Sequence, residues 1–233
     1  MSLGLIGKKI GQTRVYDAKG NVVPVTVVRA GPNRVIQRKT VEIDGYNAVQ
    51  LGFDDQKESR VTLPLNGHFK KHNTTPVKQV REFRDFTLDV KPGDVVGVDV
   101  FAPGDFIDAI GVTKGRGFEG VVKRHHFRGG DATHGAKGWH RRSGAIGCRL
   151  FPGTVNRGMK MPGHMGQVRR TVQNLEVIQV RPDDHVLLIK GAVPGAKGDY
   201  LIVRESKKRS KAFMAELKKR LAAKAEQQQK KKK

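Results

Sequence analysis

The chain has 233 residues and a formal net charge of +23, from 45 Lys and Arg against 22 Asp and Glu. Its one cysteine, Cys148, excludes an internal disulfide and a thiolate cluster for zinc, which is typical of a reducing compartment such as the cytoplasm. No stretch approaches the roughly 20 apolar residues of a membrane span, and the apolar run within residues 1–12 is too short for a secretory signal.

The positive charge lies mostly in two segments. Residues 124–170 hold ten Lys or Arg and one acid, Asp131, whereas residues 204–233 hold thirteen Lys or Arg and three acids. The remaining 156 residues carry a net charge of only +4. The composition therefore predicts one nearly neutral globular body with two cationic appendages.

Outside these segments the sequence reads as short strands separated by turn signals. Gly31-Pro32-Asn33 ends a β-branched run at 22–28 and leads into 34–38, which predicts a hairpin. Asp44-Gly45 is a second tight-turn signal, before a strand at 46–53. The spacing predicts a mainly β body, as a small closed barrel or a sandwich. Further strands are expected at residues 77–83, 95–101, 106–112, 172–180, 186–189 and 200–203.

Residues 54–75 interrupt this rhythm because they are polar and rich in turn formers. Together with the strand that follows, they predict a small α+β lobe inserted at residues 54–94. The β body itself is expected to comprise residues 1–123 and 171–204.

Residues 124–170 form a long excursion that leaves the body and returns to it. Only six of its 47 residues are Val, Ile, Leu or Phe, and this share of about 13% is below the roughly 20% under which charged segments stay disordered. Fixing one backbone residue costs roughly 1–2 kcal/mol, so ordering the excursion costs on the order of 50–90 kcal/mol with almost no core to offset it. We therefore predict that a polyanion stabilises the excursion from outside, and its ten glycines favour close approach to a nucleic acid.

Residues 115–120, Gly-Arg-Gly-Phe-Glu-Gly, match the G-x-G-x-x-G pattern of dinucleotide-binding proteins. That site needs a packed helix after the glycines and an acid about 20 residues later. Neither follows here, so no nucleotide cofactor is expected. We interpret the glycines as backbone that lies against phosphates, with charge from Lys114, Arg116, Lys123 and Arg124.

Five of the eight histidines fall in the excursion: His125, His126, His134, His140 and His164. A metal site needs converging neutral imidazoles, usually with Cys or carboxylate ligands, and the neighbours here are mostly Arg and Lys, which repel a cation. No metal is therefore expected, and we interpret these side chains as groups that stack on RNA or hydrogen-bond to it.

Trp139, the only tryptophan, lies within the basic run 137–142. It is either a buried core residue or, as its cationic neighbours favour, a stacking or wedge residue for nucleic acid. Ser143 and Cys148 have no nearby acid to orient a base except Asp131, so no catalytic constellation is expected.

The C-terminal segment, residues 205–233, is expected to be a basic helical or disordered tail. From Ser210 to Glu226, the residues Phe213, Leu217 and Leu221 recur at helical spacing among Lys and Arg, which predicts an amphipathic helix. The end of the tail has no apolar residues and is expected to be disordered unless bound. The tail is either a solubilising appendage or a further contact with RNA or a neighbouring protein.

Taken together, these motifs resemble the family of large-subunit ribosomal protein L three, in its bacterial form. The resemblance covers roughly residues 3–204. Its most specific part has the spacing of the family signature, at Phe101, Asp108, Gly111, Thr113, Gly115, Arg116, Gly117, Gly120 and Arg124. Supporting matches lie at residues 7–11, 132–135, 140–142, 144–147, 171–175 and 190–195.

The resemblance implies a translation-protein β-barrel that binds the large, 23S-type ribosomal RNA near its 3′ end and helps nucleate assembly of the large subunit in the cytoplasm. It also implies that residues 124–170 form a finger that threads into RNA toward the peptidyl transferase centre. The protein would be structural, not an enzyme, with large-subunit RNA and neighbouring ribosomal proteins as partners. No membrane, cofactor or small-molecule substrate is expected.

The expected RNA-binding side chains are basic groups, imidazoles and one indole along the signature and the finger. They are Lys8, Lys9, Lys114, Arg116, Lys123, Arg124, His125, Arg128, His134, Lys137, Trp139, His140, Arg141, Arg142, Arg149, Arg157, Lys160, His164, Arg169 and Arg170. The resemblance places closest to the peptidyl transferase centre Trp139, His140, Arg141, Arg142, Met161, Gly163, His164 and Met165.

The sequence departs from the family pattern at three places. Gln12 stands where Met is usual, His164 stands where some bacterial members have a glutamine that becomes methylated, and the tail beyond Glu205 is longer than usual. Two other classes of function stay open from the residues alone: an RNA-acting enzyme with a β-barrel recognition domain, and a nonspecific DNA-compacting protein.

Overall fold

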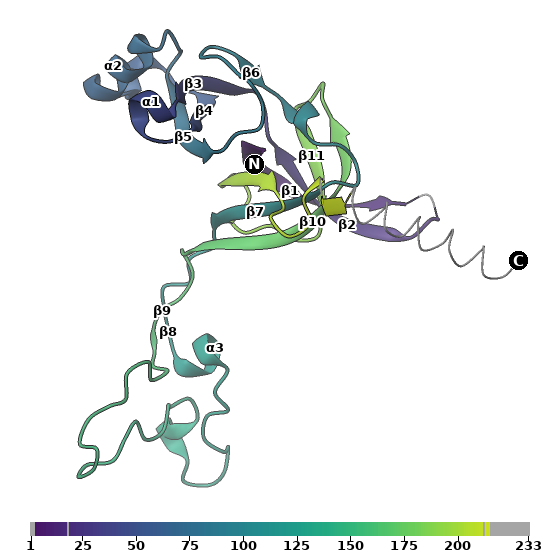
Figure 1. Cartoon of the computed structure of the whole chain (residues 1–233). Helices are drawn as coiled ribbons and strands as arrows, with labels where there is room; N and C mark the ends of the chain where they lie inside the picture. The colour runs from purple at the N-terminus through teal and green to yellow at the C-terminus, as the bar shows by residue number, and fades with distance from the viewer. Residues whose placement is uncertain (1–2, 18, 212, 215–233) are drawn as a thin grey trace, which may run out of the picture. The chain divides into compact units, whose positions relative to one another are not determined.

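The computed structural model describes residues 3–17, 19–211, 213 and 214 (Figure 1). The chain divides into two compact units, one formed by the residues up to Val112 together with those from Arg169 onward, the other by Thr113–Val168. We call the first unit the body and the second the arm. Residues 124–168 of the expected excursion lie in the arm, whereas Arg169 and Arg170 begin a strand of the body.

Six antiparallel strands of the body close into a barrel in the order β1-β12-β7-β10-β11-β2. Each strand of the ring pairs with two neighbours, so over the paired residues no edge is left open. This ring confirms the mainly β fold and decides for a barrel over a sandwich. The strands are β1 (Gly4–Tyr16), β2 (Val22–Arg29), β7 (Phe106–Val112), β10 (Arg169–Arg181), β11 (Val186–Lys190) and β12 (Tyr200–Glu205).

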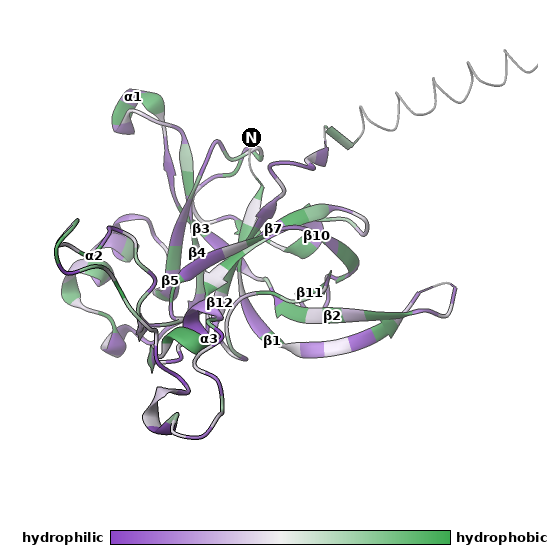
Figure 2. Cartoon of the chain, turned by 90° about the horizontal axis from the view of Figure 1, so that it is seen from below, coloured by the Kyte–Doolittle hydropathy of each residue, from purple (hydrophilic) through white to green (hydrophobic). Residues whose placement is uncertain are grey.

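The barrel encloses a core of aliphatic side chains. Along β12 the buried Leu201 and Val203, at 3% exposure or less, alternate with half-buried residues, whereas β7 is buried on both faces from Ile107 to Gly111. The period of two along β12 is what a strand requires when one face meets the core. Figure 2 shows apolar residues recurring along β2, β7 and β10. Each fully buried Val, Leu or Ile contributes roughly 1.5–3 kcal/mol through the hydrophobic effect.

A second antiparallel sheet of the body has the order β5-β4-β3-β6 and shares the barrel's core through residues such as Leu51, Phe53 and Phe83. It begins at Asn33, upstream of the lobe expected at residues 54–94. Its strands are β3 (Asn33–Lys39), β4 (Ala48–Asp55), β5 (Val77–Arg84) and β6 (Val95–Val96). Short helices accompany it: α1 (Val41–Asp44), η1 (Glu58–Arg60), α2 (Leu63–Lys71) and η2 (Val98–Val100).

The hairpin predicted from residues 22–28 and 34–38 was wrong. β2 pairs with β1 and β11 in the barrel, whereas β3 pairs with β4 and β6 in the second sheet. The Gly31-Pro32-Asn33 segment carries the chain from one sheet to the other. Asn33 fixes this crossing because its buried amide accepts from Ile6 N at 3.0 Å and donates to Ala30 O at 2.8 Å.

The arm has few regular elements. Two short strands, β8 (Phe118–Glu119) and β9 (Gly163–His164), pair with each other, and α3 (Val121–His125) and the single turn η3 (Lys137–Trp139) lie between them in the sequence. Among the described residues, no helix of the body or the arm has the length and apolarity needed to cross a membrane.

Candidate nucleic-acid interface

The arm begins and ends in a narrow two-stranded stem. Backbone hydrogen bonds join Thr113 to Val168 at 3.0 Å, and Arg116 to Met165 at 2.9 Å. Gly166 lies in this stem with φ of +79°, and a Cβ there would be 2.1 Å from the Lys114 carbonyl oxygen. Only glycine allows this backbone crossing, so Gly166 has a packing reason.

Beyond the stem, two side chains of α3 contact one carbonyl oxygen of the segment that leads back to the body, that of Met161. The Arg124 guanidinium donates to the Met161 oxygen at 2.6 Å, and a ring nitrogen of His125 lies 3.0 Å from the same oxygen. Lys123 forms an ion pair with Glu119. Arg124 and His125 are therefore half-buried and help to hold the arm together, while Lys123 stays exposed.

The rest of the arm has almost no interior. Val121 is the only buried residue between Thr113 and Val168, a range that the structure describes completely. Within the described chain, residues 143–155 form no hydrogen bond to another element, and their one regular feature is a turn at residues 149–152. This segment has neither a core nor backbone pairing to fix its conformation, as its composition predicted.

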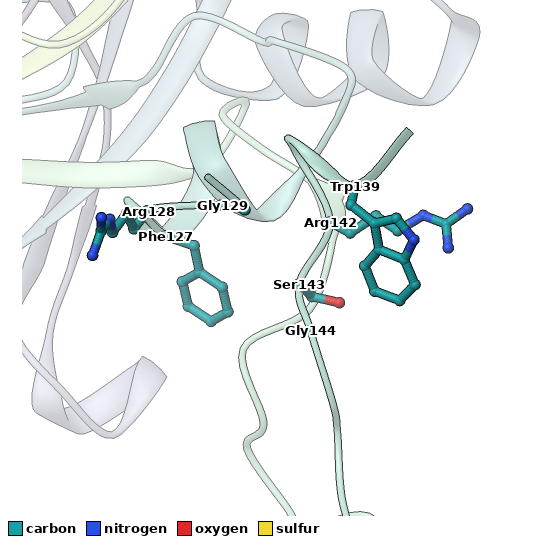
Figure 3. A pocket seen from close by; sticks show the side chains of 8 residues that line it. Phe127, Arg128, Gly129, Trp139, Arg142, Ser143 and Gly144 are labelled. Atoms are coloured by element: carbon teal, nitrogen blue, oxygen red, sulfur yellow. The ribbon is translucent and has the colours of Figure 1, made fainter. Parts of the chain in front are cut away.

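A hollow of about 420 Å³ lies in the arm beside Trp139 (Figure 3). The Arg142 guanidinium lies 4.7 Å from the centre of the Trp139 ring, a cation–π contact. Gly129, with φ of +81°, passes so close to the His140 carbonyl oxygen that a Cβ would be 2.2 Å away. The lining residues are Phe127, Arg128, Gly129, Gly130, Trp139, Arg142, Ser143 and Gly144.

This hollow offers the two features that a nucleotide requires. The rings of Phe127 and Trp139 provide apolar faces for a base, and Arg128 and Arg142 provide charge for a phosphate. Trp139 is 57% exposed and belongs to no hydrophobic cluster among the described residues. Its exposure removes the alternative that it is a core aromatic.

Most of the expected RNA-binding residues carry exposed side chains. Lys8, Arg124, His125, Met161, Gly163 and Met165 are half-buried. Exposed are Lys114, Arg116, Lys123, Arg128, His134, Lys137, Trp139, His140, Arg141, Arg142, Arg149, Arg157, Lys160, His164, Arg169 and Arg170.

Lys9 differs from the other basic residues of this set because it lies inside the body. It is 8% exposed, and its ammonium donates to the carbonyl oxygens of Val193 at 2.9 Å and Gly195 at 3.0 Å. Its charge fastens the loop before β12 to β1, so Lys9 stabilises the barrel and presents no surface to RNA.

Lys8 belongs to a polar cluster around Asp54, which joins the barrel to the second sheet. The Tyr200 hydroxyl donates to Asp54 Oδ2 at 2.6 Å, Lys78 lies 3.1 Å from that oxygen and Lys8 lies 4.0 Å from it. The hydrogen bond from Tyr200, aided by Lys78 and Lys8, lowers the pKa of the Asp54 carboxyl below its usual value. Burial, and then the nearby Asp54, raises the pKa of Tyr200 to about 12.

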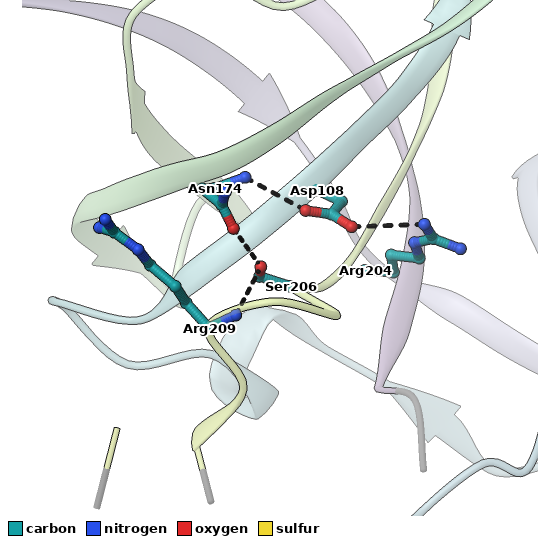
Figure 4. Close-up of polar contacts among 5 residues, drawn as sticks. All are labelled: Asp108, Asn174, Arg204, Ser206 and Arg209. Carbon is teal, nitrogen blue, oxygen red and sulfur yellow. Dashed lines mark hydrogen bonds and ion pairs between the residues drawn. The ribbon is translucent and has the colours of Figure 1, made fainter. Parts of the chain in front are cut away.

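The start of the basic tail is fixed to the barrel by a buried polar network (Figure 4). Asp108, 1% exposed, accepts from Asn174 N at 3.1 Å and pairs with Arg204 at 3.3 Å. The Ser206 hydroxyl donates to Asn174 Oδ1 at 2.6 Å and accepts from Arg209 N at 3.1 Å. The tail therefore leaves the body from a defined point. The helix predicted from Ser210 to Glu226 lies outside the described residues from position 215 onward.

The three most exposed large apolar side chains of the arm were not singled out from the sequence. Phe118 is 77% exposed, Leu150 is 93% exposed and Phe151 is 89% exposed. The sequence did contain a signal for their exposure. These apolar residues fit no repeating helix or strand pattern, and they lie in a segment with too few apolar residues to form a core. Such side chains suit a partner that offers apolar surface beside negative charge, as stacked bases do.

No metal site is present in the described part of the chain, where no three His, Cys, Asp or Glu side chains lie close enough together to hold an ion. The histidines of the arm are dispersed. His125 contacts the Met161 carbonyl, whereas His134, His140 and His164 are exposed.

Comparison with known proteins identifies the family. Residues 73–186 match the family model described as "Ribosomal protein L3". The chain is 51% identical over 212 residues to the large ribosomal subunit protein uL3 of Akkermansia muciniphila, across 90% of this chain and all of that protein. It is 49% identical over 209 residues to the protein of the same name from Deinococcus radiodurans, across 90% of this chain and 97% of the relative. The chain therefore belongs to the ribosomal protein L3 family, whose members are structural and not catalytic components of the ribosome.

Proposed function

We propose that this chain is a cytoplasmic large-subunit protein whose body binds the large ribosomal RNA near its 3′ end and helps nucleate subunit assembly. Its arm extends into the folded RNA toward the peptidyl transferase centre. The observation that carries this proposal is the single buried residue of the arm, Val121, among 56 residues. A segment without a core acquires a fixed shape only when a partner surrounds it.

The charge of the arm identifies the kind of partner. Residues 113–168 hold eleven Lys or Arg against two acids, Glu119 and Asp131. Because most of these cations are exposed and spread along the whole arm, they suit a continuous polyanion better than a single anionic ligand. The two-sided character of the Trp139 hollow, aromatic and cationic, favours RNA with unstacked bases.

Within this proposal, Trp139, His140, Arg141 and Arg142 approach the catalytic RNA together with the segment around Met161–Met165. Their part is to position RNA and not to react with substrate. The stem bonds at Arg116 and Met165 give this region a rigid base, and the unpaired segment beyond it adapts to the RNA surface.

The proposal is tested with a variant whose arm is replaced by a short Gly-Ser turn. Val112 and Arg169 are paired neighbours on β7 and β10, so such a turn closes the barrel without strain on the ring. The intact chain, neutralising about 6–10 phosphates, should lose roughly 10³–10⁵-fold in affinity for ribosomal RNA fragments between 50 and 200 mM salt, taking duplex-DNA magnitudes as a guide. The armless variant should show a clearly smaller salt dependence.

Duplex DNA of matched length serves as the control ligand. Equal affinity of the intact chain for the DNA and for its ribosomal RNA fragment would support a nonspecific DNA-compacting protein. An unchanged salt dependence after removal of the arm would show that the arm does not contact phosphates, and would contradict the proposal.

A further inference from the structure

Strand β1 extends well beyond the strand that flanks its outer side. β12 pairs only with Gly4–Lys8, whereas β2 stays paired with β1 as far as Tyr16. On the other side, β11 pairs with β2 only from Val25 onward. Residues 14–16 and 22–24 therefore continue past the ring as a two-stranded ribbon (Figure 2), and residues 11–13 before them have β2 as their only neighbouring strand. A ribbon of two strands is marginally stable when nothing covers it.

Pro24 shows which backbone groups of this ribbon face outward. The Pro24 carbonyl accepts from Gly191 N at 2.9 Å, so it points toward β11 and away from β1. Its partner across the ribbon is Arg14, which therefore sits in a pair that exchanges no hydrogen bonds with β2. The N–H and C=O of Arg14 consequently point to the open side of β1. With a period of two, the same holds for Gln12 and Tyr16, while Thr13 and Val15 bond to β2.

The open edge has a clear beginning. The backbone of Lys9 is still satisfied on its outer side, because its N–H donates to Asp199 O and its carbonyl accepts from Gly198 N. The pairing register then shifts between Lys9 and Gly11. In the described part of the chain, nothing pairs with the outer side of β1 from Gln12 to Tyr16.

The chemistry of the ribbon differs from that of the arm. Between Ile10 and Pro24 the charged residues are Arg14, Asp17 and Lys19, a net charge of only +1 in a chain of +23. Tyr16 is 61% exposed and Val22 is 54% exposed. Phosphate binding needs clustered cations, which are missing here, whereas strand addition needs open backbone groups beside apolar side chains, which are present.

We propose that the outer edge of β1, Gln12–Tyr16, is the docking site for an extended segment of a neighbouring large-subunit protein, which adds to the barrel sheet as a further strand. The partner segment would be close to neutral and would place apolar side chains against Tyr16. The proposal rests on incorporation of the chain into the large subunit, and it goes beyond the RNA contacts of the arm.

Hydrogen–deuterium exchange tests this edge in the full chain, alone and within purified large subunits. In the free protein, the outward amides of Gln12, Arg14 and Tyr16 should exchange rapidly, whereas those of Thr13 and Val15 should be protected. In the subunit, the three outward amides should slow by at least about tenfold, because an added strand accepts from them. Co-sedimentation with the subunit is scored separately, so a failure of incorporation is distinguished from a failure of strand addition.

Photo-crosslinking identifies the molecule that covers the outer edge of β1, with a benzophenone-bearing phenylalanine in place of Tyr16. A crosslink to a large-subunit protein, together with slowed outward amides, supports the proposal. Outward amides that stay fast in the subunit overturn it. Slowed amides with a crosslink to RNA overturn it as well, because the edge would then be covered by nucleic acid. Arg14→Ala is the matched variant: it removes the charge but keeps the N–H, so amide protection should be unchanged.

Discussion

The body and the arm obtain their order in opposite ways. In the body, the ring of strands encloses Leu5, Ile107, Leu187 and Val203, each with no exposed surface. In the arm only Val121 is buried, and the sequence is rich in glycine, lysine and arginine. One chain therefore combines a unit stabilised from inside with a unit that, under the proposed function, takes its order from RNA.

The largest expected effect comes from placing a charge in the core of the body. Val98 is fully buried, so Val98→Asp leaves an unpaired carboxylate without water and should destabilise the body by at least about 3–5 kcal/mol. Val155→Asp makes the same change at a residue of the arm that is 44% exposed and should alter stability by less than about 0.5 kcal/mol. Thermal unfolding followed by circular dichroism measures both. Equal destabilisation would remove the distinction between the two units.

A second pair of variants compares a buried with an exposed carboxylate. Asp108→Ala removes the partner of Arg204 and of Asn174 N, so we expect a loss of about 3 kcal/mol in the free energy of unfolding. Asp131→Ala removes the exposed partner of Arg128 in the arm and should cost less than about 0.5 kcal/mol. Denaturant unfolding gives both values. A small effect at Asp108 would show that the start of the tail does not depend on this network.

Changes in the arm should act on binding and leave folding unchanged. Trp139→Ala should weaken binding to ribosomal RNA fragments by about 1–3 kcal/mol, the usual contribution of one aromatic stacking contact. The melting temperature should stay the same, because Trp139 packs on no core. Trp139→Phe, which keeps a flat ring, should recover part of the affinity. A lowered melting temperature of the free protein with unchanged RNA affinity would place Trp139 among the structural residues.

The smallest effect concerns the pH dependence of the body. Tyr200 has a folded pKa of about 12, raised from 10, so its contribution is complete below pH 10 and is lost as pH rises toward 12. Asp54 has a lowered pKa, so its contribution is present above its unfolded value near 4 and is lost as pH falls further. Tyr200→Phe should therefore cost about 1 kcal/mol at neutral pH and flatten both limbs of the stability profile.

Tyr16, an exposed residue of the β1–β2 ribbon, provides the control for this experiment. Tyr16→Phe removes a hydroxyl without touching the Asp54 cluster, so the shape of the pH profile should match that of the parent chain. A profile for Tyr200→Phe that keeps the parent's loss of stability between pH 10 and 12 would show that Tyr200 is not its source.

Much of the candidate site followed from composition because charge and apolar content are properties of a segment and not of its neighbours. The near absence of Val, Ile, Leu and Phe in residues 124–170 predicted a segment without a core, and no residue of this segment is buried. The exposure of Leu150 and Phe151 was not predictable in the same way. Nothing in a local pattern says that an apolar side chain will find no partner in its own chain.

The sequence by itself determined where most strands form and where a core is impossible, as β7 at Phe106–Val112 and the coreless arm illustrate, since period and composition act over a few neighbouring residues. It did not predict β1 at Gly4–Tyr16, and the strand expected at residues 95–101 is only the short β6 followed by the turn η2. Only the tertiary structure decided which strands pair. Gly4 meets Arg204, and the run at 22–28 joins β1 and β11 in place of the residues that follow it. The tertiary structure also decided that the Lys9 side chain turns inward, because its ammonium donates to the carbonyl oxygens of Val193 and Gly195. A barrel closes through contacts between residues that are distant in the sequence. The local preference of a segment for strand or helix does not specify these contacts.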